Sequence, residues 1–386
     1  MMKAAVYEEF GGQIKVKNIP KPKLSSKYSV IVNVMATGVC RSDWHGWKGH
    51  DDDIKNHGLP FIPGHELAGI IVEKGSAVQK LSIGNRVAIP FILSCNNCVE
   101  CKRNKPTVCL NQSQPGFTMN GSFAEFVEIT KADHNLRIIP EGVSFIEAAA
   151  LGCRFTTAYR TVVQQGLQID NIQDALQNRR RRSNGLKKNI CVFGAGGLGL
   201  SCVVIAKAMK NILGSDEIGD IIAVDVSQAA LLKAKEVGAT FTINVRDYDM
   251  NNEKVRQRVY ELTGGNGAEL TIDAAGFIDT CENAVYTCRR GCRMIQVGLP
   301  IGGRPPMIPM GIVAGRELEL IGSHGFSAKD LPTILQLVKS GTLCVKDLIE
   351  KEVMLEEGAK ALMDMDKVGQ QLGMTVITRF DDSCRL

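Results

Sequence analysis

The feature that most constrains the fold is a glycine-rich segment between a strand-like run and a helix-like run. Residues 194–199 read Gly-Ala-Gly-Gly-Leu-Gly, and the apolar run 190–193 precedes them. Glycines at this spacing permit a tight turn, a close approach of the backbone to a pyrophosphate and close packing of helix on strand. The segment therefore predicts a dinucleotide-binding turn at the edge of a parallel sheet. Its candidate cofactor contacts are Gly194, Gly196, Gly197, Leu198 and Gly199.

Strand-like and helix-like segments alternate along the second half of the chain. Such alternation predicts an α/β domain with a doubly wound parallel sheet. The expected strands are 189–194, 220–226, 241–245, 270–276, 292–298 and 318–323. The expected helices are 198–209, 228–237, 251–263, 279–289 and 331–339.

The first part of the chain has a different pattern, because short apolar or alternating runs are separated by Gly, Pro and Asn. That pattern predicts a β-rich domain, and 386 residues are more than one hydrophobic core usually serves. We expect a β-rich domain over 1–160, a nucleotide-binding domain over 161–325, and a last segment, 326–386, that contributes a helix and returns to the first domain. Inserted loops are expected near 168–188 and 211–220.

An acidic residue at the end of the expected strand 220–226 bears on the choice of cofactor. Asp225 stands where a carboxylate accepts hydrogen bonds from the adenosine ribose hydroxyls. A 2′-phosphate would meet its negative charge, so Asp225 favours NAD over NADP. It lies further from the glycine-rich turn than is usual, which the insertion at 211–220 explains.

Four closely spaced cysteines form the strongest local signal for a metal. Thiolates in the pattern C-x2-C-x2-C-x7-C can converge on one tetrahedral zinc ion and close all its positions. A closed site of this kind stabilises a loop and is not catalytic. An iron–sulfur cluster and free thiols are the alternatives. The four residues are Cys95, Cys98, Cys101 and Cys109.

Three further metal-ligand candidates lie far apart in the first 153 residues. Cys40, His65 and Cys153 supply two soft ligands and an imidazole, and a catalytic zinc needs three protein ligands and one open position. Each residue alone is a weak signal, because single cysteines and histidines are often structural. Chemically useful neighbours surround them, namely Arg41, Ser42, Asp43, His45 and Glu66.

Taken together, these motifs resemble the zinc-containing medium-chain alcohol dehydrogenase family, and the resemblance covers nearly the whole chain. The motifs follow the order of that family: the first two ligands, the four-cysteine loop, the third ligand, the glycine-rich turn and the acidic residue. The resemblance implies a GroES-like catalytic domain and a Rossmann domain. It also implies two zinc ions per chain, one catalytic and one structural, and a homodimer or homotetramer formed through the edge of the nucleotide-domain sheet.

The resemblance also implies roles for individual residues. Cys40, His65 and Cys153 would bind the catalytic zinc, Asp43 would orient His65, and Glu66 would lie behind the metal. Ser42 would receive the alcohol proton, which would reach His45 through the nicotinamide ribose. Further implied contacts are Arg41 and Val297 to the cofactor and Trp47 and Phe91 to the substrate.

The implied reaction is reversible hydride transfer from an alcohol to NAD, giving an aldehyde or a ketone. A polyol or amino-alcohol dehydrogenase of the threonine type is an alternative within the same superfamily, since only the shape of the pocket distinguishes these enzymes. A catalytically idle binding protein is a further alternative, and it would use the arginine run 179–182.

Composition limits the partners and the location. Four of the five net positive charges come from 166–189, so the rest of the chain does not have the charge of a nucleic-acid-binding surface. No apolar run is long enough to span a membrane, and Met1–Phe10 lacks the pattern of a secretory signal. We therefore expect a cytoplasmic protein with a small-molecule substrate.

Overall fold

The computed structural model describes residues 1–170, 172, 187–300, 304–367 and 373–380. The chain divides into two compact units. Unit 1 consists of Met1–Thr156 and Gly325–Leu386, and unit 2 consists of Thr157–His324. The arginine run 179–182 and most of the expected insertion 168–188 lie outside the described residues.

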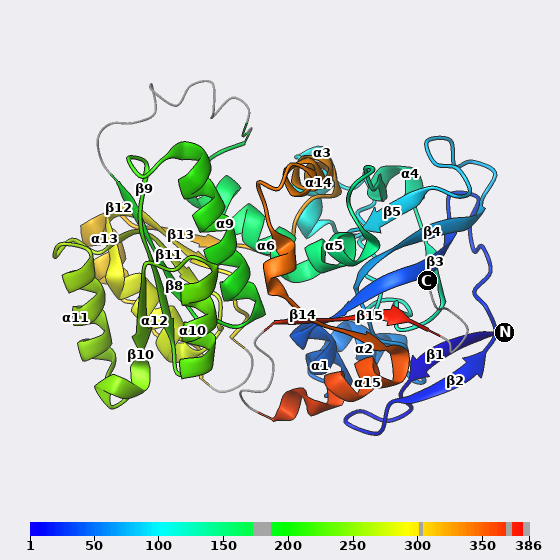
Figure 1. Ribbon diagram of the computed structural model, residues 1–386, viewed down its shortest axis with the longest axis horizontal. Coiled ribbons are helices and arrows are strands. Elements are labelled where there is room, and N and C mark those ends of the chain that lie inside the picture. Colours follow the sequence, from blue (N-terminus) through cyan, green and yellow to red (C-terminus); the bar gives the residue numbers. More distant parts are fainter. Residues whose placement is uncertain (171, 173–186, 301–303, 368–372, 381–386) are drawn as a thin grey trace. The chain divides into compact units, whose positions relative to one another are not determined.

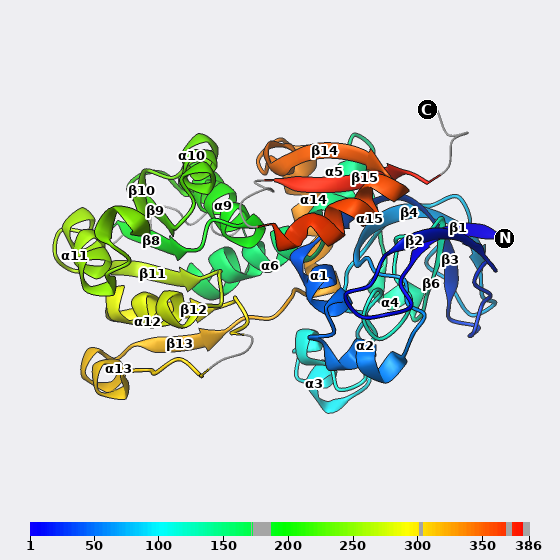
Figure 2. The same ribbon diagram turned by 90° about the horizontal axis from the view of Figure 1, so that it is seen from below.

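Unit 2 contains a six-stranded sheet in which all neighbouring strands are parallel. The strand order is β10-β9-β8-β11-β12-β13, so the chain starts in the middle of the sheet and crosses over after β10 (Figure 2). The strands are β8 (Lys188–Phe193), β9 (Ile218–Asp225), β10 (Phe241–Asn244), β11 (Ala268–Asp273), β12 (Cys288–Gln296) and β13 (Glu319–Gly322).

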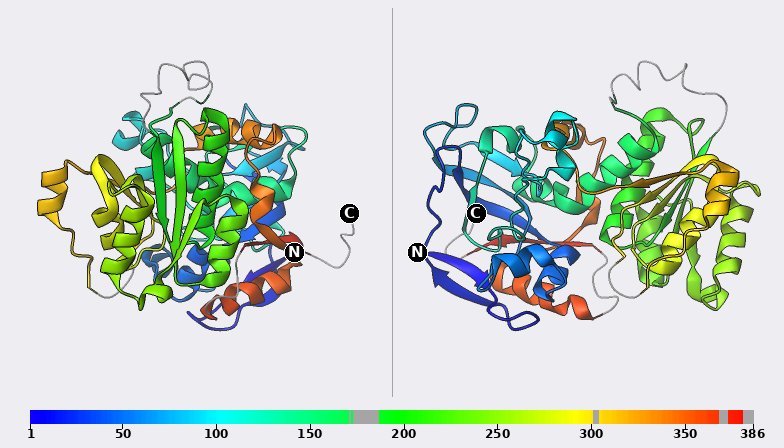
Figure 3. Two further views of the ribbon diagram at one scale, coloured as in Figure 1. Left: turned by 60° about the vertical axis from the view of Figure 1, so that its left-hand side comes forward. Right: turned by 180° about the vertical axis from the view of Figure 1, so that it is seen from behind.

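Helices lie on both faces of this sheet (Figure 3). The central strands are consequently buried on both sides, and the last four residues of β8 are apolar and buried. The helices of unit 2 are α9 (Gly197–Leu213), α10 (Gln228–Val237), α11 (Asn252–Leu262), α12 (Ile278–Thr287) and α13 (Met310–Arg316). The Ser227 hydroxyl accepts a hydrogen bond from the Ala230 amide and caps α10.

Unit 1 is β-rich, and its main sheet joins segments from both ends of the chain. The C-terminal β15 (Met374–Arg379) pairs antiparallel with β3 (Val30–Val39), and the two strands lie side by side in Figure 1. The strand order is β14-β15-β3-β4-β5-β7, and β6 also pairs with β3. The other strands are β1 (Met2–Val6), β2 (Lys15–Ile19), β4 (Glu66–Lys74), β5 (Arg86–Ile89), β6 (Phe126–Ile129), β7 (Arg137–Ile138) and β14 (Ile349–Met354).

The helices of unit 1 are mostly short, and α5 packs against β3, β4 and β5 of the main sheet. They are α1 (Arg41–Trp47), α2 (Asp52–His57), α3 (Val99–Lys102), α4 (Ala132–Asn135), α5 (Phe145–Ala150), α14 (Leu331–Lys339) and α15 (Leu355–Met363). A π-helical turn, Leu151–Phe155, follows α5, and α6 (Thr156–Tyr159) follows that turn.

The structure confirms the predicted fold class, an α/β domain with a doubly wound parallel sheet and a β-rich domain. One local expectation is wrong. The segment 211–220 is not a continuous loop, because α9 runs on to Leu213 and β9 begins at Ile218. The four residues 210–213 extend the helix by about one turn beyond its expected end. Among the described residues, no helix combines the length and apolar character needed to cross a membrane.

Candidate functional site

Asp43 joins the two segments that carry the first two ligand candidates. Cys40 directly follows β3, and Asp43 in the first turn of α1 reaches back to accept the Cys40 amide at 3.2 Å. Its other oxygen, Oδ1, accepts the amide of Gly64 at 3.0 Å and Nδ1–H of His65 at 2.7 Å. The side chains of Asp43 and His65 are both buried. The carboxylate therefore fixes the orientation of the His65 ring.

A glycine directly before His65 permits this arrangement. Gly64 has a φ of +107°, and a side chain there would clash with Ser122 and Phe123. The turn leads directly into β4, so His65 and Glu66 leave a rigid strand end. The local sequence thereby places the His65 imidazole in the interior of unit 1.

Cys153 reaches the same place by a distortion of its helix. It lies in the π-helical turn after α5, where Gly152 has non-helical dihedral angles of −44° and −133°. A side chain on Gly152 would overlap the side chain of Glu66. Single π-helical turns of this kind often occur at functional sites. Here the distortion brings the thiol close to Cys40.

The three candidates and Glu66 form one cluster. The ligand atoms of Cys40, His65, Glu66 and Cys153 all lie within 4.8 Å of one another. Nε2 of His65 is buried and has no hydrogen-bond partner among the described residues. An unpartnered polar atom in a protein interior is costly unless something binds it. Two sulfurs and an imidazole nitrogen are ligands that zinc prefers, so the residues fit this metal.

The protonation tendencies of the cluster favour a cation. A hydrogen bond from Cys153 lowers the pKa of Cys40 to about 5, in spite of the burial of the thiol. Burial alone would lower the pKa of His65, but the Asp43 carboxylate and the Cys40 thiolate outweigh it and hold that pKa well above its usual range. The Asp43 carboxylate and the Cys40 thiolate thus favour positive charge at the His65 ring, whereas the hydrogen bond to Cys40 and burial hold the pKa of Cys153 well above its usual range.

Arg154 is a functional residue that sequence reasoning missed. Its Nε and Nη2 donate to the Glu66 carboxylate at 3.2 and 2.6 Å, and its amide donates to Oε1 at 3.1 Å. Both side chains are buried, and Arg154 lowers the pKa of Glu66 against the effect of burial. The sequence signal was an arginine in an otherwise uncharged stretch, which predicts a buried acidic partner.

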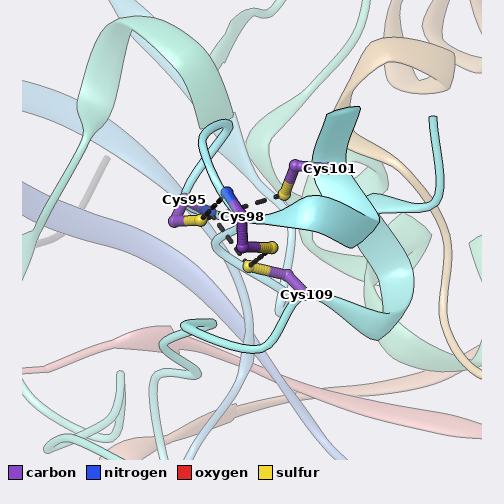
Figure 4. Close-up of side chains that lie close together, drawn as sticks. All are labelled: Cys95, Cys98, Cys101 and Cys109. Carbon is purple, nitrogen blue, oxygen red and sulfur yellow. Dashed lines mark hydrogen bonds between the residues drawn. The ribbon is translucent and has the colours of Figure 1, made fainter. Parts of the chain in front are cut away.

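The four-cysteine cluster is local and partly exposed (Figure 4). The Sγ atoms of Cys95 and Cys101 are 3.9 Å apart, and those of Cys98 and Cys109 are 3.7 Å apart. Sulfurs at tetrahedral positions about 2.3 Å from one zinc ion lie about 3.8 Å apart. Backbone amides also point at the sulfurs, with Cys98 donating to Cys95 at 3.2 Å. The cluster therefore has the dimensions of a closed zinc site.

The glycine-rich turn lies between β8 and α9. Gly194 has a φ of +93°, and a side chain on Gly199 would collide with the Gly194 carbonyl, whereas the space beside Gly196 is open. α9 begins at Gly197, so its first amides face this turn. The Asp225 carboxylate accepts hydrogen bonds from the amides of Ala195 at 2.7 Å and Ser227 at 2.8 Å.

The remaining candidates have different surroundings. Phe91 packs its ring edge-on to His65, with centroids 5.8 Å apart. Trp47 is buried in the core of unit 1 and donates Nε1–H to the Gly12 carbonyl at 2.7 Å.

Ser42 is half-buried. Arg41 stacks on Trp44 at 3.8 Å and donates to the Met365 carbonyl, and Val297 directly follows β12 and is buried. The expected contacts of these residues with ligands stay predictions.

Comparison with known proteins agrees with these motifs. Residues 26–140 match the family model of the alcohol dehydrogenase GroES-like domain, and residues 197–340 match that of zinc-binding dehydrogenases. An alcohol dehydrogenase of Geobacillus stearothermophilus is 32% identical over 97% of this chain and 99% of its own length. A probable D-xylulose reductase A of Emericella nidulans is 30% identical over 92% of this chain and 90% of its own.

A solved structure is also similar along the whole chain. It is an alcohol dehydrogenase from E. coli CFT073 complexed with NADH, with a TM-score of 0.78 and 25% identity over 98% of this chain and 99% of that chain. The chain belongs to the zinc-containing medium-chain dehydrogenase family. It is an oxidoreductase that acts on CH–OH groups and uses zinc and a nicotinamide cofactor. The predicted family and class of enzyme are confirmed.

Proposed function

We propose that this chain is an NAD-dependent alcohol dehydrogenase that converts an alcohol reversibly into an aldehyde or a ketone. The observation that carries the proposal is the buried Nε2 of His65, which lies beside the thiols of Cys40 and Cys153 and has no hydrogen-bond partner in the described segments. Three residues distant in sequence supply a donor set for one metal ion, and the family uses zinc. Glu66 is occupied by Arg154, so three protein ligands leave a position for the substrate.

The chemistry divides between the bound groups and the protein. Bound zinc would make an alcohol hydroxyl more acidic, and a bound nicotinamide would accept a hydride. The side chains of Cys40, His65 and Cys153 would hold the metal, and Asp43 keeps Nδ1 of His65 protonated so that Nε2 is left as the free donor atom. Ser42 accepts the proton of the substrate hydroxyl while it gives up its own hydroxyl proton, and His45 passes a proton on toward solvent. Phe91, against the His65 ring, excludes water from one side of the site.

A second zinc ion per chain belongs to the proposal. The sulfur separations of 3.9 and 3.7 Å support a tetrahedral site in the loop 95–109. This site would be structural, because four thiolates occupy every position of the metal.

NAD, with NADP less favoured, is proposed as the cofactor. Asp225 supports this preference, since its carboxylate ends β9 and already accepts two amide hydrogen bonds beside the glycine-rich turn. We expect Asp225→Gly to reduce the preference for NAD over NADP by about tenfold or more, because a charged hydrogen bond contributes about 1.5–3 kcal/mol. Steady-state kcat/KM with both cofactors measures the change. An unaltered ratio of the two values would show that Asp225 does not determine the preference for NAD.

The substrate is a small alcohol in our proposal, with a polyol as the second candidate. The xylulose reductase relative at 30% identity supports that second candidate. A panel of primary alcohols, secondary alcohols, polyols and threonine, assayed with NAD beside zinc quantification, tests both. Activity on alcohols with two zinc ions per chain supports the proposal. A fully metallated protein that oxidises no member of the panel contradicts it.

A homodimer or homotetramer in the cytoplasm completes the proposal. β13 lies at one edge of the parallel sheet, and Leu320 on it is 39% exposed, so this edge can pair with a second copy. The free thiols suit a reducing compartment. Light scattering after size exclusion measures the assembly, and a monomer at all concentrations would exclude it.

A further inference from the structure

A second histidine packs against His45, and no step of the proposed reaction uses it. Nδ1 of His45 and Nδ1 of His50 are 3.1 Å apart. Two imidazole nitrogens at this distance share one proton, because one ring must donate and the other must accept. The pair therefore couples the tautomer of His45 to that of His50.

The backbone after α1 builds this pair. The His50 amide donates to the His45 carbonyl at 2.9 Å, and the Gly49 amide donates to the Gly46 carbonyl at 2.9 Å. Gly49 has a φ of +74°, which favours glycine, and a side chain there would press against the Phe10 ring. The turn thus folds His50 back over the last turn of the helix.

Trp44 fixes the two rings from the side. Its ring lies edge-on to His45 at 4.9 Å and to His50 at 5.7 Å, and it is 9% exposed. Arg41 covers Trp44 at 3.8 Å, and Lys48 lies 5.8 Å from the same ring. His45 is half-buried, whereas His50 is exposed. The pair therefore connects the interior of unit 1 with solvent.

His45 alone is a poor proton carrier in these surroundings. Burial, Arg41 of the same helix and His50 of the following loop lower the pKa of His45 to about 4. About one His45 ring in a thousand would then carry an extra proton at pH 7. Because His45 is so rarely charged, it transfers protons faster if it loses a proton from one ring nitrogen while it gains one at the other.

We propose that His50 is the terminal proton-transfer residue of the relay and exchanges the substrate proton with water through its shared hydrogen bond with His45. The inference rests on the proposed role of His45. A proton bonds to Nε2 of His45 while the proton on Nδ1 of His45 moves to Nδ1 of His50. The Nε2–H bond of the exposed His50 ring then breaks and releases a proton to water. Exchange with solvent restores the first tautomers, and carbonyl reduction runs in the opposite direction.

The test compares His50→Gln, His45→Ala and a control, His57→Gln. Glutamine keeps a hydrogen-bonding side chain but cannot carry the proton. His57 lies on α2 and packs on Phe61, outside the pair. Proton release in a single turnover of the full-length holoenzyme is followed with a pH indicator across pH 5.5–9. NMR of the imidazole nitrogens reports the titration of His45 without any turnover.

We expect His50→Gln to slow proton release by about 3- to 10-fold, a small part of the 10²–10⁴ typical of acid–base catalysis. Added imidazole should restore the rate, KM should stay unchanged, and the titration of His45 should move to higher pH because a neighbouring positive charge is lost. His57→Gln should change none of these quantities.

Three results would overturn the inference, and they are distinguishable. If His45→Ala slows proton release but His50→Gln changes neither the rate nor the titration of His45, the relay ends at His45 and only this inference fails. If His45→Ala has no effect either, the proposed role of His45 fails as well. A slow His50→Gln variant that imidazole does not rescue would show that His50 is only structural.

Discussion

The two cysteine-containing clusters of unit 1 differ in the way the chain builds them. The four-cysteine cluster comes from one stretch of 15 residues, and three of its thiols are partly exposed. The cluster of Cys40, His65 and Cys153 spans 114 residues and is built from two strand ends and a distorted helix. Local spacing alone can form the first, whereas the second exists only when the whole unit is folded.

The clusters differ equally in what surrounds their ligand atoms. Backbone amides hold the four thiols, as between Cys98 and Cys95. Side chains hold the other cluster, because Asp43 binds His65, and Arg154 binds Glu66. A metal in the first cluster would stabilise a loop, and a metal in the second would act on a substrate. The following changes test that division, beginning with the largest expected effect.

Cys40→Ala should have the greatest effect on activity. The change removes one of three proposed ligands, and metal catalysis is worth several kcal/mol of transition-state stabilisation. We expect kcat/KM to fall by about a thousandfold or more and one of two zinc ions to be lost, with little change in the melting temperature. Cys202→Ala, which removes an equally buried thiol from α9, is the control. Full activity with one zinc ion would contradict the assignment.

Cys98→Ser should affect stability instead. Metal binding at closed cysteine sites contributes to folding, so the melting temperature should drop by about 5 °C or more. Activity per folded molecule should remain close to that of the wild type. Calorimetry and zinc quantification measure both quantities, and Cys344→Ser, at an exposed thiol outside both clusters, serves as control. If Cys98→Ser and Cys40→Ala lowered stability equally, the division into a structural and a catalytic metal site would be wrong.

Asp43→Asn should weaken one metal site selectively. Asp43 accepts hydrogen bonds from Cys40, Gly64 and His65, and loss of such a partner typically costs 10- to 100-fold in metal affinity. Competition with a chelator should release zinc from the buried site at correspondingly lower chelator concentrations. The four-cysteine site supplies the internal control. Equal weakening of both sites would show a general loss of structure.

Arg154→Lys should give the smallest effect. Lysine keeps the charge beside Glu66 but cannot make the two-pronged contact. We expect the free energy of unfolding to fall by about 1–2 kcal/mol, less than the 3–5 kcal/mol for removing a buried partner. Arg289→Lys, in the more exposed pair with Glu269, should change it by less than about 1 kcal/mol. Urea unfolding measures both free energies. Equal changes in the two variants would show that the Arg154–Glu66 pair contributes no more to stability than the more exposed pair.

Most of the fold was predictable because its signals are local. The order of strands and helices in unit 2 follows from alternating apolar periods, and α10 and α14 lie where they were expected. The end of α9 was misplaced, because polar residues and Gly214 concealed its last turn. The pairing of β15 with β3 joins residues more than 330 positions apart, and no local pattern reports such a contact.

The candidate site was predictable in its residue types but not in its supporting contacts. Cys40, His65 and Cys153 were identified only by their order along the chain and by resemblance. The Arg154–Glu66 ion pair and the His45–His50 pair were not predicted, because an isolated arginine and an exposed histidine have no distinctive spacing in the sequence. Trp47 lies in the hydrophobic core with its indole N–H donated to the Gly12 carbonyl, and its expected contact with the substrate stays a prediction.

The sequence by itself determined the glycine-rich turn, the alternation of strands and helices, and the four-cysteine loop. Each depends on residues within a few turns of chain, where steric limits and ligand spacing act directly. Only the tertiary structure decided that Cys40, His65 and Cys153 meet, that Asp43 orients the imidazole and that Nε2 of His65 has no hydrogen-bond partner within the described parts of the chain. These contacts require long loops to close, and the packing of the whole unit, not any single segment, provides the free energy for that closure.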